Sequence, residues 1–160
     1  MKAAVLTVSD RVSRGEAEDG SGPAVAADLR AIGFDVTGVT VVPDGVESVS
    51  EALRRLCAEA SLVVTTGGTG LGPRDLTPEA TASVIERNDP GLAEAMRAAT
   101  FGSNPHGMLS RGVCGTVGRT LVVNLPGSVL GATESLAVIA AALPHAVELL
   151  VATPSDHNAR

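Results

Sequence analysis

The chain has 160 residues, of which 44% are hydrophobic and 19% charged, so we expect one compact domain with a sizeable core and exclude a largely disordered protein. Twelve basic and 18 acidic residues give a formal net charge of −6, which argues against nonspecific binding to nucleic acid or to an anionic membrane. The only aromatic residues are two phenylalanines, so the stacking surfaces that read single-stranded nucleic acid are missing.

The chain carries no pattern typical of export or membrane insertion. Its first residues run directly into an apolar stretch, residues 3–8, without a later cleavage-site pattern. The longest uninterrupted apolar stretch, residues 136–144, is far shorter than the roughly 20 residues that cross a bilayer. We therefore expect a cytoplasmic protein. Cys57 and Cys114 lack the spacing of a metal-binding pair and are predicted to be small buried side chains.

The first half of the chain predicts strands that alternate with helices. Apolar, β-branched runs indicate the strands, and apolar residues at helical spacing, followed by glycine, indicate a helix. The predicted order is a strand over residues 2–9, a polar loop over 10–22, a helix from Pro23 to Gly33, a strand over 36–42, a helix whose apolar face spans 49–57, and a strand over 62–66.

The second half continues the same alternation. We expect Thr77 to cap a helix with Pro78 at its first position, and this helix to run through Arg87. The remaining predicted elements are a helix over 91–100, a loop over 102–107, strands over 113–117 and 120–124, and helices over 129–143 and 145–151. No linker or repeat is visible, so we expect a single domain over residues 1–153 and a short tail over 154–160.

Strands separated by helices of ten to fifteen residues predict right-handed βαβ units and a mostly parallel sheet. The fold class is therefore α/β. Because ligands bind at the carboxyl edge of such a sheet, polar loops that follow strands are the candidate functional segments.

A glycine-rich loop, residues 65–72, follows the third predicted strand. Its glycines would let backbone N–H groups approach an anion, and the hydroxyls of Thr66 and Thr69 add donors. A turn without any ligand is an equally good interpretation of these residues. The loop is not a Walker A loop, because Lys2 is the only lysine in the chain, and Pro73 occupies the third glycine position of a dinucleotide fingerprint.

Two aspartates, Asp44 and Asp75, follow predicted strands and should lie at the same edge of the sheet. Paired carboxylates near a phosphate are what Mg²⁺ needs during phosphoryl or nucleotidyl transfer. Each aspartate also has a simpler interpretation. Asp44 could cap the next helix, with Glu47 at capping-box spacing, and Asp75 could be a turn residue before Thr77.

Three further segments could add polar groups to this edge. Residues 124–128 end a strand and open a helix, whose backbone N–H groups could bind an anion, although Ser128 could simply cap that helix. Ser9 and Asp10 lie in a loop that could be merely solvated. Residues 110–111 offer a hydroxyl and a guanidinium suited to phosphate, although a surface arginine often binds nothing. His106 has no partner nearby in sequence and is given no ligand role.

Taken together, these segments resemble the Mog/MoaB family of molybdenum cofactor biosynthesis, which includes the G domain of gephyrin. The resemblance covers about residues 3–150. It rests on Ser9-Asp10-Arg11, Pro43-Asp44, Thr66-Gly67-Gly68-Thr69-Gly70, Arg74-Asp75-Leu76-Thr77-Pro78-Glu79-Ala80, Leu109-Ser110-Arg111 and Asn124-Leu125-Pro126-Gly127.

The resemblance implies a three-layer αβα domain with a mostly parallel central sheet, assembled as a homotrimer. It also implies a transferase that adenylylates molybdopterin: the terminal phosphate of molybdopterin attacks the α-phosphorus of Mg·ATP, pyrophosphate leaves, and the product passes to a molybdenum-insertion protein. The small-molecule substrates would be ATP and molybdopterin, with Mg²⁺ as cofactor.

Site roles carry over by position in this sequence. Asp44 and Asp75 match the two aspartates regarded as essential in the family, and they would hold Mg²⁺ and orient the nucleotide. The nucleotide would be bound by Thr66, Gly67, Gly68, Thr69, Gly70, Asn124, Pro126, Gly127 and Ser128. The pterin would be bound by Ser9, Asp10, Ser110 and Arg111.

One departure and three alternatives accompany this resemblance. Arg119 stands where relatives often have a small residue; it could help bind phosphate or could alter the pterin pocket, so it bears on the pterin contacts more than on the nucleotide contacts. A catalytically silent member that only binds molybdopterin is the main alternative, although Asp44 and Asp75 are both present. Related amidohydrolases and metal-insertion proteins are normally longer than this chain, and no linker indicates a gephyrin-like scaffold.

Overall fold

The computed structural model describes residues 1–152, so the predicted tail at 154–160 and the domain end at 153 lie outside the described residues. The strands are β1 (Lys2–Val8), β2 (Asp35–Val42), β3 (Leu62–Thr66), β4 (Arg87–Asn88), β5 (Cys114–Val117) and β6 (Thr120–Leu125). The helices are α1 (Asp10–Ser13), α2 (Ser21–Ala31), α3 (Val46–Cys57), α4 (Thr77–Ala82), α5 (Pro90–Ala98), α6 (Val129–Ile139) and α7 (Leu143–Val151), with a 3-10 helix η1 at Pro105–Leu109.

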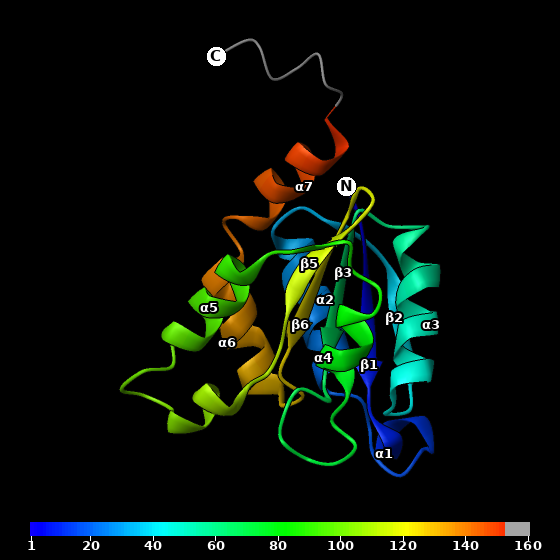
Figure 1. Ribbon diagram of the computed structural model, residues 1–160, viewed down its shortest axis with the longest axis vertical. Coiled ribbons are helices and arrows are strands. Elements are labelled where there is room, and N and C mark those ends of the chain that lie inside the picture. The colour runs from blue at the N-terminus through cyan, green and yellow to red at the C-terminus, as the bar shows by residue number, and fades with distance from the viewer. Residues whose placement is uncertain (153–160) are drawn as a thin grey trace.

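One six-stranded sheet, in the order β2-β1-β3-β6-β5-β4, forms the centre of the molecule (Figure 1). Strands β2, β1, β3 and β6 are parallel, and β5 and β4 continue the sheet in antiparallel pairing. A tight turn at Gly118, whose φ is +54°, joins β5 to β6. The α/β class and the mostly parallel sheet predicted from the sequence are confirmed.

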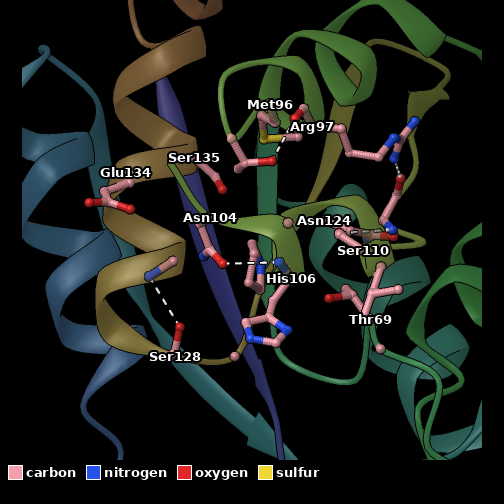
Figure 2. Close-up of a pocket in the computed structure, with 18 of the residues that line it drawn as sticks. Thr69, Met96, Arg97, Asn104, His106, Ser110, Asn124, Ser128, Glu134 and Ser135 are labelled. Carbon is pink, nitrogen blue, oxygen red and sulfur yellow. Dashed lines mark hydrogen bonds between the residues drawn. The ribbon is translucent and has the colours of Figure 1, made fainter. Parts of the chain in front are cut away.

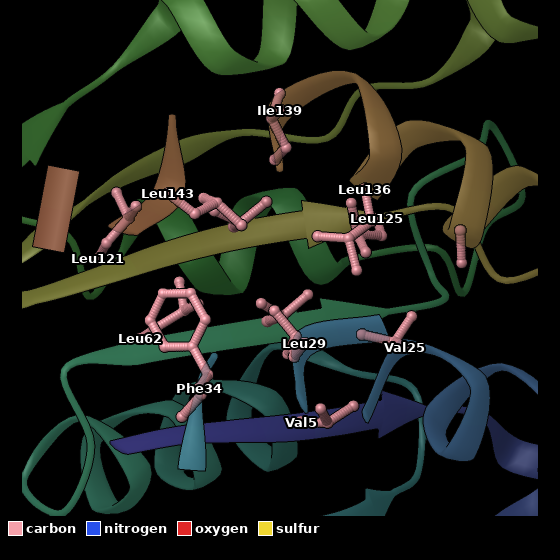
Figure 3. Close-up of a cluster of buried hydrophobic side chains, with 14 of the residues drawn as sticks. Val5, Val25, Leu29, Phe34, Leu62, Leu121, Leu125, Leu136, Ile139 and Leu143 are labelled. Atoms are coloured by element: carbon pink, nitrogen blue, oxygen red, sulfur yellow. The ribbon is translucent and has the colours of Figure 1, made fainter. Parts of the chain in front are cut away.

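Helices cover both faces of the sheet, because the side chains of each central strand alternate between two apolar clusters. Ala3 and Val5 pack with α2, α5, α6 and α7 on one face, where Phe34 fills the space beside Leu62 (Figure 3). Ala4 and Leu6 pack with α3 and with Ala80 of α4 on the other. The result is the three-layer αβα arrangement.

The parallel strands place the loops of interest at one edge. Thr66 at the end of β3 pairs with Thr7 of β1 and with Leu125 of β6, and Val8 pairs with Val42 of β2. The segments that follow these four strands therefore start side by side. This shared edge is what the sequence pattern predicted.

The boundaries of several elements differ from expectation. The predicted loop over 10–22 contains the single turn α1, because Ser9 accepts a hydrogen bond from the Val12 amide at 3.3 Å and caps it. Helix α2 begins at Ser21, two residues before Pro23. Helix α7 begins at Leu143, inside the range predicted for the preceding helix.

The prediction of a helix from Thr77 through Arg87 is wrong at both ends. Leu76 occupies the N-cap position, and the Thr77 hydroxyl donates instead to the carbonyl of Gly67 at 2.9 Å. The helix ends at Ala82, because the amide of Glu86 already bonds to the carbonyl of Thr116 in β5. The chain therefore pairs with the sheet before it reaches Arg87, the predicted end of the helix.

No single helix within residues 1–152 is long and apolar enough to cross a membrane. Helices α6 and α7 reach the required length and hydropathy only as a pair bent by 63°. Both contribute buried side chains to the core, among them Leu136 and Val147.

Candidate active site

The loops that follow β3 and β6 touch each other through glycine. The Thr66 hydroxyl donates to the carbonyl of Pro126 at 2.8 Å, and a Cβ on Gly127 would lie 3.1 Å from the Cα of Gly67. Gly67 has φ +101°, and a Cβ there would lie 2.2 Å from the carbonyl oxygen of Val8. Glycine is therefore required at this crossing both by conformation and by space.

Two pockets lie on either side of this crossing. The larger has a volume of about 590 Å³ and the smaller about 510 Å³. Four residues line both: Gly68, Asp75, Gly127 and Ser128. The pockets therefore meet at the glycine-rich loop and the start of α6.

The larger pocket lies between α6 on one side and α5 with η1 on the other (Figure 2). Apolar side chains of Met96, Leu109 and Val138 line it together with polar groups. Seven of the nine residues predicted to bind nucleotide also line it: Gly68, Thr69, Gly70, Asn124, Pro126, Gly127 and Ser128. The remaining two, Thr66 and Gly67, line the smaller pocket.

The sequence did not single out the far wall of the larger pocket. Arg97, Asn104, His106 and Ser135 all line this pocket, although no sequence pattern indicates a role for them (Figure 2). Arg97 is tied to the backbone, because its Nη1 donates to the carbonyl of Gly112 at 2.9 Å. These residues follow no local pattern, and only tertiary packing of α5 and η1 against α6 brings them together.

Asp44 and Asp75 both line the smaller pocket. Asp44 Oδ2 accepts a hydrogen bond from the Asp10 amide at 2.7 Å, and Asp75 Oδ2 accepts one from the Gly72 amide at 2.9 Å. Within the described part of the chain, the hydrogen bonds thus engage one oxygen of each carboxylate, and Oδ1 of each is left for a ligand. Asp44 Oδ1 lies beside Gly68, where a Cβ would approach it to 3.1 Å.

The electrostatics of Asp44 reflect its crowded position. Burial raises the pKa of Asp44, and the nearby charges of Asp10 and Asp75 raise it further, while the hydrogen bond from the Asp10 amide opposes these effects. A cation between the carboxylates would relieve this repulsion. A carboxyl group whose pKa is shifted by burial and by neighbouring charge, in a pocket, is a candidate for a functional role.

The donor set fits Mg²⁺ held jointly with a substrate. No group of three or more His, Cys, Asp or Glu side chains in residues 1–152 is arranged to hold a metal ion. Mg²⁺ is usually bound by one or two carboxylates together with water and substrate phosphates, which matches two aspartates with free oxygens. A metal such as Zn²⁺, which needs three or four protein ligands, does not fit.

Of the simpler interpretations of the two aspartates, the turn at Asp75 is confirmed and the helix cap at Asp44 is not. Asp44 does not cap α3, because Gly45 is the N-cap and no side chain caps that helix, so the capping box with Glu47 is absent. Asp75 does form a turn with Gly72, whose carbonyl accepts from the Asp75 amide at 3.0 Å. Ser128 caps α6 as expected and accepts from the Gly131 amide at 3.1 Å.

Asn124 lies in the wall of the larger pocket, but its amide group is fully engaged. Its Nδ2 donates to the hydroxyls of Thr65 and Thr81, both at 3.0 Å, and its Oδ1 accepts from the amide of Val113. The Thr66 hydroxyl is likewise engaged with a carbonyl. These two side chains support the site and leave no free donor for a nucleotide.

The four residues predicted to bind the pterin do not form one site. Ser9 lines the smaller pocket and Ser110 the larger. Asp10 lines neither; it forms an ion pair with Arg74, in which Arg74 Nε lies 3.0 Å from Asp10 Oδ2. The four residues are separated because one pair follows β1 and the other pair follows η1, on different sides of the glycine-rich loop.

Arg111 is occupied by protein acceptors instead of facing a pocket. Its guanidinium bonds to the carboxylate of Glu79 and donates to the carbonyls of Gly70, at 2.8 Å, and Asp75. The Arg111 amide also donates to the carbonyl of Thr69 at 2.9 Å. Arg111 therefore holds the glycine-rich loop against α4.

Arg119 lies in the turn between β5 and β6, at the amino end of β6. The pockets lie at the carboxyl end of that strand, about 17 Å away for a strand of this length. Arg119 accordingly lines neither pocket.

Comparison with known proteins gives consistent results. Residues 4–145 match the family described as "Probable molybdopterin binding domain". The chain is 37% identical to a molybdopterin adenylyltransferase from Helicobacter pylori (strain J99), over 92% of this chain and 86% of that protein. It is 39% identical to gephyrin from Dictyostelium discoideum over 95% of this chain, but spans only 23% of that much longer relative.

The fold is also shared with solved structures. The molybdopterin biosynthesis enzyme MoaB from Thermus thermophilus superposes with a TM-score of 0.90 at 44% identity, covering 96% of this chain and 98% of that one.

Proposed function

The chain belongs to the "Probable molybdopterin binding domain" family, and we propose that it works in molybdenum cofactor biosynthesis as a molybdopterin adenylyltransferase. The observation that carries this proposal is a pair of carboxylates, each with one oxygen that accepts no hydrogen bond from the described residues: Asp75 lines both pockets, and Asp44 lines the smaller one. An enzyme that joins two substrates needs two pockets with a shared reacting point. The names of relatives that match over most of the chain support this activity.

We assign the adenosine of ATP to the larger pocket. The side chains of Met96, Leu109 and Val138 offer apolar contacts to a flat base. The loop before α6, with Gly127 and Ser128, offers backbone N–H groups and the positive end of an eleven-residue helix to phosphate.

We assign molybdopterin to the smaller pocket, with its terminal phosphate toward the shared residues. This pocket is lined by Glu18, whose carboxyl group is an acceptor suited to the N–H groups of a pterin ring, and by Ser9, which carries a hydroxyl group. Of the four residues predicted to bind the pterin, Ser9 keeps that role in this proposal.

The reaction needs no nucleophile from the protein. The phosphate of molybdopterin attacks the α-phosphorus of ATP, a new P–O bond forms, the bond to the β-phosphate breaks, and pyrophosphate leaves. The residues around Gly68 and Gly127 orient the two phosphates so that attack can occur. Asp44 and Asp75 would hold Mg²⁺, which neutralises charge on the phosphates.

Local groups rather than bulk charge would bind these anions. The net charge of −6 repels anionic substrates, and Arg74 and Arg111 near the loop are paired with Asp10 and Glu79. Backbone N–H groups and a divalent cation therefore remain as the main positive partners.

The alternative function is a catalytically silent protein that binds molybdopterin. Both carboxylates are present with free oxygens, which favours the active enzyme. We further propose a homotrimer located in the cytoplasm, with product handed to a molybdenum-insertion protein.

The proposal is tested by pyrophosphate release from purified protein supplied with molybdopterin, Mg²⁺ and ATP. We expect release that requires molybdopterin and that Asp75→Asn reduces by at least about 100-fold, because the variant loses a carboxylate at the reacting point. Asp35→Asn is the matched control, since Asp35 is exposed at the opposite end of the sheet. Tight molybdopterin binding without any pyrophosphate release would instead support the silent alternative.

A further inference from the structure

Asp10 and Asp44 bind each other through a reciprocal pair of hydrogen bonds. The Asp10 amide donates to Asp44 Oδ2 at 2.7 Å, and the Asp44 amide donates to Asp10 Oδ1 at 3.1 Å. This pair joins Asp10 at the start of α1 to Asp44 in the loop just after β2, 34 residues away in the sequence. It fixes one oxygen of Asp44 and so directs the other.

Arg74 adds the loop after β3 to this pair. Its Nε and Nη2 each lie 3.0 Å from one oxygen of the Asp10 carboxylate, in the two-pronged geometry that arginine forms with a carboxylate. Its Nη2 also donates to the carbonyl of Asp44 at 2.7 Å. One guanidinium therefore contacts both aspartates and comes from the residue next to Asp75.

Resting on the proposed function, we propose that Asp10 and Arg74 are positioning residues that act as one unit. They hold Asp44 and the loop that carries Asp75 at the relative position that the reaction requires. Neither residue contacts the pterin, which replaces the role predicted for Asp10 from the sequence.

The exposure of Arg74 and Asp10 indicates that their ion pair contributes little to folding stability and acts mainly in positioning. The Arg74 side chain is 62% exposed and that of Asp10 23%, and ion pairs so close to solvent add little to folding stability. These two side chains nevertheless connect all three loops, since Arg74 reaches Asp10 and Asp44 and the Asp10 carboxylate also accepts from the Asp44 amide.

The ion pair between Asp10 and Arg74 also reduces the negative charge around the site. Three carboxylates, Asp10, Asp44 and Asp75, gather at this edge, and the charges of Asp10 and Asp75 both act on Asp44. Arg74 neutralises Asp10, the one carboxylate of the three that has no place in either pocket. The other two carboxylates remain available for a cation.

The first test is a double-mutant cycle with Asp10→Asn, Arg74→Gln and the double variant. We expect each single variant to lower kcat at least about tenfold, because small displacements of reacting groups are costly, with KM for molybdopterin changed less than about twofold. We expect the double variant to be no worse than the poorer single variant, since the two act together. Arg74→Lys should restore only part of kcat, because lysine lacks the two-pronged geometry.

The matched control is Arg14→Gln. Arg14 lowers the pKa of Asp10 through its charge, but its side chain hydrogen-bonds only to Glu16 among the described residues. Loss of this arginine removes a nearby positive charge without removing a contact between the loops, and we expect kcat to stay within about twofold.

A second readout uses no substrate and no metal. Backbone amide hydrogen exchange of Arg74→Gln should be faster than in the original protein at Asp10 and over residues 71–76, with Tm lowered by less than about 4 °C. A protein without any pyrophosphate release would refute the proposed function, and hydrogen exchange would then decide the positioning role alone.

Three results would overturn the inference. A raised KM for molybdopterin at unchanged kcat in Asp10→Asn would make Asp10 a substrate contact. Losses that add in the double variant would show independent roles. Unchanged hydrogen exchange in Arg74→Gln would show that the arginine does not hold the loop.

Discussion

At the scale of single residues, the uncharged side chain of Asn124 connects three segments around the site. Its buried amide joins β6 to Thr65 of β3, to Thr81 of α4 and to the segment before β5. Asn124 is only 2% exposed, and a polar group buried this deeply is costly to leave without a hydrogen-bond partner. One side chain thus adds hydrogen bonds between elements that carry the glycine-rich loop and the larger pocket.

We predict that Asn124→Ala lowers the free energy of unfolding by at least about 2 kcal/mol, because two buried hydroxyls, of Thr65 and Thr81, and the half-buried amide of Val113 lose a hydrogen-bond partner. Urea denaturation measures this directly. Asn88→Ala, in exposed strand β4, is the matched control and should change it by less than about 0.5 kcal/mol. Equal effects of the two substitutions would refute the role given to Asn124.

Residue roles were only partly predictable from the sequence. The positions of Asp44 and Asp75 follow from their place after parallel strands, and the structure places both in one pocket. The hydrogen-bond partners of Asn124 and Arg111 were not predictable, because spacing along a chain does not reveal which acceptors a long polar side chain will find after folding. Residues of α5 and η1 carried no local signal at all.

At the scale of elements, the site depends on loops that approach more closely than side chains allow. Gly67 and Gly127 let the segments after β3 and β6 cross in contact, and Gly67 also passes the end of β1. The strands themselves were predictable, since continuous apolar, β-branched runs indicate strands covered on both faces. The crossing of the loops was not, because it depends on the register of three strands.

Two glycine substitutions distinguish the cost of a positive φ from the cost of a steric clash at Cβ. Gly33 and Gly67 have nearly equal φ values, +96° and +101°, but a Cβ on Gly33 meets nothing within 4 Å. We predict that Gly33→Ala costs about 1 to 2 kcal/mol of stability from backbone strain alone, and that Gly67→Ala costs clearly more because of the clash with Val8. Equal losses in urea denaturation would mean that the loop can move away from the end of β1.

At the scale of the whole molecule, we expect the alkaline stability to depend on two thiols, the buried Cys114 and the half-buried Cys57. Burial raises the pKa of Cys57 to about 11 and that of Cys114 to about 12, against an ordinary value of 9.0. Both cysteines are free. The chain has no tyrosine and only one lysine, so few other side chains ionise in this range.

The direction of the pH effect follows from these shifts. The unfolded chain releases its thiol protons near pH 9 while the folded protein keeps them, so the stability from burial is complete below about pH 9 and is lost as pH rises toward the folded values. We predict that the free energy of unfolding falls between about pH 9 and 11 by up to about 1.4 kcal/mol per pH unit for each thiol. Cys114→Ala should flatten this slope, and an unchanged slope would exclude the thiols as its cause.

The proposed activity depends above all on the two pockets bringing the α-phosphorus of ATP to the phosphate of molybdopterin beside Asp44 and Asp75. The most direct measurement supplies ATP labelled with ³²P at the α-phosphate, together with Mg²⁺ and molybdopterin, and follows the label by chromatography. We predict that the label moves into the pterin product, and that Asp44→Asn abolishes the transfer while Asp35→Asn does not. Label that stays in nucleotide, with molybdopterin bound, would contradict the proposed reaction.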